Sequence, residues 1–162
     1  MRRIFLVSGI VILCLVVQLV FARVLGSSFV PNFVLIAVVF FNLYRGLRYS
    51  LGAAFLGGFL LDSFSGSPMG FNVFSLVMCA FILGSVKKFI YQPGVAESRL
   101  LMVFLTVISN SFLQYFVNVA AGIRIDFTVV LWGAMVPEIV LTLVFALYTL
   151  ERLKKCASKL YS

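Results

Sequence analysis

The hydrophobic residues of this chain form long continuous runs that are separated by short polar segments. A helix that crosses a bilayer needs about 20 apolar residues, and six runs reach or approach that length. They cover residues 4–22, 29–44, 51–64, 69–86, 100–121 and 129–150. Because apolar and polar positions do not alternate, the runs predict helices and not the strands of a barrel. The sequence therefore predicts an all-α polytopic membrane protein with six transmembrane helices.

The composition also indicates that lipid surrounds this chain. The 162 residues are 63% hydrophobic and 11% charged, whereas a soluble domain has about a quarter of its residues charged. A chain with so few charges cannot cover a water-exposed surface, so lipid must cover most of it. We expect a single transmembrane helical domain over residues 1–162, with residues 151–162 forming a basic cytoplasmic tail.

The basic residues predict the orientation of these helices. If the N-terminus is cytoplasmic, only Arg23 and Arg124 fall on outer segments, and the other 11 of the 13 basic residues fall on inner ones. This is the distribution that the positive-inside rule describes, and it predicts that both termini are cytoplasmic. The net charge of +8 then indicates contact with anionic lipids. Charges spread over several short loops do not indicate nucleic-acid binding.

The N-terminal segment resembles a signal peptide, since Arg2 and Arg3 precede an apolar run. That run is longer than the roughly 7–15 residues of a removable signal, so we expect a retained signal-anchor helix. Cys14, Cys79 and Cys156 are far apart, and the chain has no histidine. This pattern predicts no metal site, no redox pair and no cofactor.

A stripe of small residues in the third run ends in a carboxylate. Ala54, Gly58 and Asp62 are four residues apart, and Gly57 lies beside them, so one helix face is narrow and ends in Asp62. Small residues let helix backbones approach closely in lipid. We therefore predict that this helix is central and tightly packed, and that the stripe forms a packing or partner interface.

Asp62 also predicts how the next helix begins. A negative charge is unfavourable at the C-terminal end of its own helix, but a tight hairpin brings it near the free N–H groups that open the following helix. Gly66 offers a stop, Ser67 and Pro68 resemble an N-cap and a first helical residue, and Gly70 follows. We expect Asp62 to tie this outer hairpin, while a direct role in a partner interface or ligand site stays open.

The fifth run carries a polar stripe. Thr106, Asn110, Gln114 and Asn118 are four residues apart, with Ser111 beside them. Polar groups in hydrocarbon lack water, so the stripe must face protein or a wet cavity. Hydrogen bonds between helices explain it most simply, and a binding cavity or a subunit groove is the alternative.

The sixth run contains an intramembrane carboxyl group, Glu138, directly after Pro137. Such a group is costly and indicates a functional site by default. No basic residue is expected at its depth, so it is either protonated or bonded to the stripe of the fifth helix or to Gln18. Pro137 predicts a local kink. One acid without a visible relay makes proton transport a poor interpretation.

Two segments resemble a known family. They are residues 31–36 and, with Gly52, the glycine-rich stretch 57–70. Together they resemble the rod shape-determining protein MreD family of the bacterial inner membrane. The resemblance implies a multi-pass protein of the cell-wall elongation machinery that works with an MreC-like protein, the MreB filament, RodA and a class B penicillin-binding transpeptidase. It also implies a bundle similar to the substrate-binding subunits of vitamin transporters.

Catalysis is disfavoured by the residues themselves. There is no histidine to act as a general base, and Asp62 and Glu138 are not expected to converge. A serine without a base is not an active nucleophile, so we predict no catalytic residue. We expect a non-catalytic scaffold that positions peptidoglycan synthases through a membrane-anchored partner. The alternative is a substrate-binding subunit of a membrane transporter for a small molecule such as a vitamin.

Overall fold

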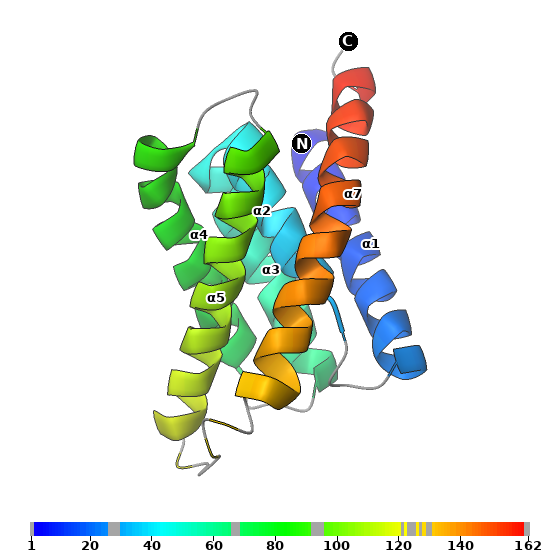
Figure 1. The fold of residues 1–162 in the computed structure, drawn as a ribbon. Helices are drawn as coiled ribbons and strands as arrows, with labels where there is room; N and C mark the ends of the chain where they lie inside the picture. Colours follow the sequence, from blue (N-terminus) through cyan, green and yellow to red (C-terminus); the bar gives the residue numbers. More distant parts are fainter. Residues whose placement is uncertain are drawn as a thin grey trace.

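A computed structural model describes residues 2–25, 30–65, 69–91, 96–120 and 131–160, with positions 122, 126 and 128 between the last two ranges. The described residues are helical almost throughout (Figure 1). The elements in chain order are α1 (Arg2–Leu25), α2 (Phe33–Arg45), α3 (Leu47–Ser65), α4 (Phe71–Ile90), α5 (Ala96–Ala120), the π-helical segment η1 (Leu131–Met135) and α7 (Val136–Leu160). The all-helical fold class predicted from the apolar runs is confirmed.

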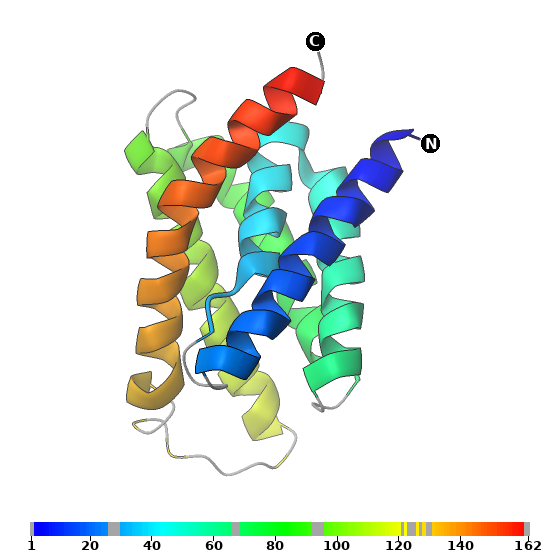
Figure 2. The ribbon, with the colours of Figure 1, turned by 90° about the vertical axis from the view of Figure 1, so that its right-hand side faces the viewer.

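Successive long helices run antiparallel, so the start of α1 and the end of α7 lie at the same end of the bundle (Figures 1 and 2). The end of α2, the start of α3, the end of α4 and the start of α5 lie there as well. The basic residues of these four helix ends therefore gather at that end, which we call the basic end: Arg45, Arg48, Lys87, Lys88 and Arg99. Arg23 lies in the last turn of α1, at the opposite end.

Three helical segments of the described chain are long and apolar enough to cross a membrane: Val7–Val24, Phe71–Phe89 and Glu97–Ala120. Two shorter apolar helices, Phe33–Arg45 and Val136–Thr149, accompany them. The sequence predicted six spans. The difference lies mainly in α2, which has only 13 residues and at 1.5 Å per residue is about 20 Å long, and in α3, whose apolar stretch is interrupted by charged and small residues.

The central helix is α2 and not α3, which corrects the expectation drawn from the glycine stripe. All residues from Phe33 to Leu43 are buried, and α2 packs against α1, α3, α4, α5 and α7. Lipid and protein interior both favour apolar side chains, so a uniformly apolar run does not reveal whether its helix is central or peripheral.

Neighbouring helices complete the C-terminal end of α2. The last carbonyl groups of a helix lack partners within that helix. Here the Lys87 ammonium group donates to the carbonyl oxygens of Asn42 (2.9 Å) and Leu43 (2.8 Å), and the N–H of Gly46 donates to the Phe41 carbonyl. Gly46 has φ +92°, a conformation that favours glycine. A short helix is thus held by side chains from elsewhere in the bundle.

The glycine pair of α3 lets three helices approach closely. A Cβ on Gly57 would lie 2.5 Å from Val34 Cγ1 of α2, and a Cβ on Gly58 would lie 2.5 Å from the Cα of Val73 in α4. Ala54 is fully buried on the same helix. The close packing expected of this stripe therefore occurs inside the bundle, against α2 and α4.

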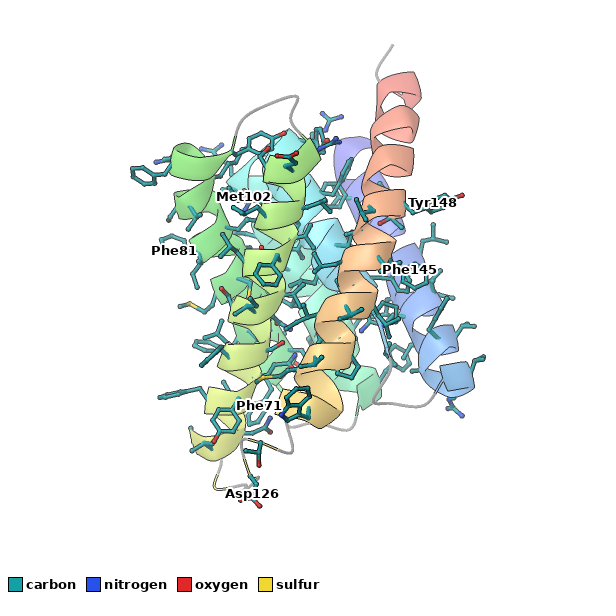
Figure 3. All side chains as sticks on the ribbon, viewed as in Figure 1. Phe71, Phe81, Met102, Asp126, Phe145 and Tyr148 are labelled. Atoms are coloured by element: carbon teal, nitrogen blue, oxygen red, sulfur yellow. The ribbon has the colours of Figure 1, made fainter. Side chains whose placement is uncertain are left out.

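Aromatic rings join the remaining helices. Phe21 of α1, Phe33 of α2 and Phe145 of α7 form a triangle of edge-to-face contacts with centroids 5.2–5.5 Å apart. Figure 3 shows Phe145 on the side of α7 near α1, whereas Tyr148 points away from the bundle. These contacts hold α1 and α7 on two sides of α2 (Figure 2).

The last helix begins irregularly. The π-helical turn Leu131–Met135 leads directly into α7, in which Pro137 is the second residue. Proline has no N–H to donate to the carbonyl four residues earlier, and the irregularity expected from Pro137 takes the form of this wide turn. α7 then continues to Leu160, so the segment 151–162, expected as a basic tail, is helical over most of its length.

Candidate functional site

Asp62 holds the start of α4. Its carboxylate accepts hydrogen bonds from the backbone N–H groups of Gly70 (2.9 Å), Asn72 (3.0 Å) and Val73 (3.3 Å). The Asn72 side-chain amide donates a fourth, at 2.9 Å. A carboxylate at a helix N-terminus satisfies free N–H groups and interacts favourably with the helix dipole. The geometry agrees with the expectation that Asp62 ties the hairpin between α3 and α4.

The start of α4 itself differs from the prediction. The helix begins at Phe71, and its N-cap is Gly70, which has φ +100° and no side chain to accept a hydrogen bond. The prediction that Ser67 and Pro68 open this helix was therefore wrong, because Asp62 supplies the cap from α3. Gly66 and Pro68 lie outside the described residues. The hydroxyl of Ser63 donates to the Phe59 carbonyl and does not serve Asp62.

The polar stripe of α5 continues the Asp62 network. The Gln114 amide donates to Asn72 Oδ1 at 3.2 Å, so a chain of hydrogen bonds runs from α3 through α4 to α5. Further along, the Ser75 hydroxyl donates to Asn110 Oδ1 at 2.7 Å. Asn118 donates to the carbonyl of Gln114 within α5. Asn110 and Gln114 thus make hydrogen bonds to α4, as the simpler interpretation of the stripe expects, whereas Thr106 and Asn118 bond carbonyl groups of α5 itself.

A second polar cluster surrounds the N-terminus of α2. Asn32 is buried and caps this helix, since its Oδ1 accepts from the N–H of Leu35 at 3.0 Å. Gln18 of α1 accepts from the N–H of Val34 (3.2 Å), and the Thr142 hydroxyl of α7 accepts from the N–H of Asn32 (3.1 Å). The N-cap residue and two other helices, α1 and α7, therefore satisfy the free N–H groups of α2 inside the bundle.

Glu138 belongs to this second cluster. Its Oε1 accepts from the Asn32 side-chain amide at 3.2 Å. The Ser111 hydroxyl lies beside the carboxyl group, although it makes no hydrogen bond of ordinary geometry within the described chain. Gln18, one of the two partners expected from the sequence, bonds α2 instead. The carboxyl group therefore connects α7 to the N-terminus of α2 and lies next to the stripe of α5.

The structure thus divides the predicted residues into two groups. Asp62, Gly70 and Gln114 belong to the α3–α4–α5 network, with Ala54, Gly57 and Gly58 packed on α3 beside it. Glu138 belongs to the α2 cluster. Asn32, Thr142 and Asn72 were not proposed from the sequence, although an Asn directly before an apolar run is a recognisable N-cap signal.

The polar groups of both clusters make hydrogen bonds between helices. Within the described residues, no group of three or more histidine, cysteine, aspartate or glutamate side chains is placed to hold a metal ion. The carboxyl group of Asp62 lies at the N-terminus of α4, and that of Glu138 lies at the N-terminus of α2. Such an arrangement fixes the relative positions of helices.

The comparisons with known proteins agree with this description. The model of the family described as rod shape-determining protein MreD matches residues 1–152. Neither the curated proteins nor the solved structures include a significant match, so the expected likeness to transporter subunits stays a prediction. A match over nearly the whole chain shows that this protein belongs to the MreD family of bacterial membrane proteins, whose role is rod shape determination.

Proposed function

We propose that this protein is a non-catalytic scaffold of the cell-wall elongation machinery, spanning the bacterial cytoplasmic membrane six times with the basic end in the cytoplasm. It binds an MreC-like membrane-anchored protein and thereby positions peptidoglycan synthases. The MreB filament, RodA and a class B penicillin-binding transpeptidase are the further partners in this proposal. Anionic lipids contact the basic end. The family match over residues 1–152 is the observation that carries the proposal.

The use of the polar residues supports a scaffold. The Asp62 carboxylate accepts four hydrogen bonds from α4, and Asn32, Gln18 and Thr142 serve the N-terminus of α2. These groups hold helices together, and a rigid bundle suits a protein that fixes the positions of others. We assign Ala54, Gly57, Gly58, Asp62 and Gly70 to this internal packing.

The outer helix faces support binding within the membrane. Large apolar side chains on α1, α5 and α7 are exposed, among them Leu13 (64%), Phe116 (73%) and Val144 (59%). In a bilayer such faces contact either lipid or another transmembrane helix. A membrane-anchored partner therefore has several helix faces on which to pack without disturbing the interior.

One cavity among the described residues bears on the transporter alternative. A cavity between α4 and α5, lined by Cys79, Leu83, Leu105, Thr106 and other side chains, has a volume of about 70 Å³. Pockets for small molecules have volumes of about 300–1,000 Å³, so this cavity is too small for a vitamin. Its volume corresponds to about two water molecules.

Gentle detergent extraction followed by mass spectrometry of the proteins that co-purify tests the proposal. We expect an MreC-like protein together with wall synthases. Variants of the outer faces, such as Leu13→Ala, Phe116→Ala or Val144→Ala, should reduce recovery of the partner from one face and leave the bundle folded. Recovery of an ATPase module with a coupling membrane subunit, or of a bound vitamin, would contradict the scaffold and support transport.

A further inference from the structure

The seam between α3 and α4 on the outside of the bundle has a defined register. The side chain of Leu47 would lie 2.9 Å from a Cβ on Gly84, and Val73 Cα would lie 2.5 Å from a Cβ on Gly58. Both pairs of residue numbers add up to 131, so residues of these antiparallel helices that share this sum lie at about the same height. Figure 1 places α4, and Figure 2 places α3, at the periphery.

Two stripes of exposed residues flank this seam, and in this register Lys88 lies about five residues closer to the basic end than Arg48. On α3 they are Arg48, Gly52, Phe55 and Phe59, and on α4 they are Phe74, Met78, Phe81, Ser85 and Lys88. Spacings of three and four residues place each set on one helix face. The opposite faces are occupied, since Gly57 of α3 contacts α1 and α2 and Ser75 and Cys79 of α4 contact α5. Each stripe carries its cation at the basic end and aromatic rings below it.

The two cations of the seam are available for a ligand. Lys87, the neighbour of Lys88, is engaged by carbonyl oxygens of α2, and Arg99 donates to the Tyr44 hydroxyl. Arg48 and Lys88 are exposed and make no hydrogen bond or ion pair with any other residue that the structure describes. Glu97, an acidic residue at this end, is in the first turn of α5, which packs on the far side of α4.

On each helix, a small residue lies one turn from the cation, on the side away from the basic end. A Cβ on Gly52, one turn from Arg48, would meet nothing within 4 Å. Ser85, one turn from Lys88, is exposed, and its hydroxyl donates to the carbonyl of Phe81 in its own helix. The surface is therefore low on α3 between Arg48 and the ring of Phe55, which is 55% exposed, and on α4 between Lys88 and the ring of Phe81, which is 57% exposed. Figure 3 shows Phe81 on the outer side of α4.

We propose that this seam binds one anionic phospholipid. Its phosphate lies between Arg48 and Lys88 beside Ser85, its glycerol region covers Gly52, and its acyl chains lie along Phe55, Phe59 and Phe74. Charge complementarity determines this choice, because two unpaired cations above an apolar surface match an anionic headgroup above acyl chains. The inference rests on the membrane location in the proposed function and is independent of any protein partner.

Native mass spectrometry of the full chain, in detergent with equal amounts of phosphatidylglycerol and phosphatidylethanolamine, tests this site. We expect one phosphatidylglycerol to be retained in preference. The double variant Arg48→Gln/Lys88→Gln should weaken that retention roughly 25-fold, because each cation near an anionic lipid contributes about a factor of five. Arg23→Gln removes one cation at the opposite end and is the matched control, expected to change nothing.

Gly52→Leu provides a second test that leaves both cations in place. Open space surrounds Gly52, so the variant should fold normally while its side chain fills the low surface and reduces phosphatidylglycerol retention. Equal retention in the wild type and both seam variants would overturn the proposal. So would equal loss in Arg23→Gln, or loss of an MreC-like partner from the seam variants without a change in bound lipid. If only variants outside the seam reduce recovery of the protein partner, that result concerns the proposed scaffold and not this lipid site.

Discussion

Asp62 and Glu138 are both carboxyl groups at the N-terminus of a helix from elsewhere in the chain, yet their surroundings differ. Asp62 accepts four hydrogen bonds, three of them directly from backbone N–H groups of α4. Glu138 reaches α2 through one side-chain amide, that of Asn32. The comparison shows that Asp62 is part of the backbone hydrogen bonding of the fold. Glu138 contributes one hydrogen bond between α7 and α2, beside the one that Thr142 accepts.

The largest effect is expected from Gly58→Leu, which destroys the contact beneath the Asp62 site. Its Cβ would lie 2.5 Å from the backbone of Val73, so α3 and α4 must separate at a cost of about 3 kcal/mol or more. We expect most of the protein to be lost as aggregate in fluorescence-detected size-exclusion chromatography. Gly52→Leu on the same helix is the control, and a normal elution profile for both variants would disprove the close packing.

Asp62→Ala should have the next largest effect. It leaves the N–H groups of Gly70, Asn72 and Val73 without their acceptor, at a cost of about 3–5 kcal/mol in unfolding free energy. The thermal midpoint in detergent measures this change. Ser63→Ala, at an exposed neighbouring position, should shift the midpoint very little, and a similar shift in both variants would argue against the cap.

Asp62→Asn and Glu138→Gln test how many acceptor oxygens each of the two carboxyl groups must supply. Four donors need both carboxylate oxygens of Asp62, and an amide offers only one oxygen, so Asp62→Asn should cost about 2 kcal/mol. Asn32 needs a single acceptor, which the amide oxygen introduced by Glu138→Gln still provides, so this second variant should cost less than about 1 kcal/mol. Thermal midpoints in the reverse order would show that Glu138 bears the larger structural role.

The smallest effect is expected from Ser111→Ala beside Glu138. The Ser111 hydroxyl is buried without a hydrogen bond of ordinary geometry in the described chain, and removing an unsatisfied polar group is neutral or slightly stabilising. We expect the thermal midpoint to stay the same or rise slightly. Ser75→Ala, which removes the 2.7 Å bond to Asn110, is the contrasting variant and should lower it.

Asp62 and Glu138 also show which contacts can be predicted from the sequence alone. The role of Asp62 follows from short-range features, since its partners are 8 to 11 residues away across one hairpin. The partner of Glu138 is 106 residues away, and a single sequence contains no signal for that contact. Apolar runs predicted the helices, but they did not reveal that α2 is central, because lipid and protein interior favour the same residues. The start of α4 was also mispredicted, because its cap comes from another helix.

Photo-crosslinking in a rod-shaped bacterium that depends on this protein would show directly whether its outer helix faces bind a membrane-anchored partner. A photoreactive residue is placed in turn at exposed positions of α1, α3, α4, α5 and α7, and at buried Val107 as the control. We expect crosslinks to an MreC-like protein from neighbouring outer positions of one or two helices and none from Val107. Crosslinks to a transporter module, or an absence of protein crosslinks from every outer face while the cells remain rod-shaped, would contradict it.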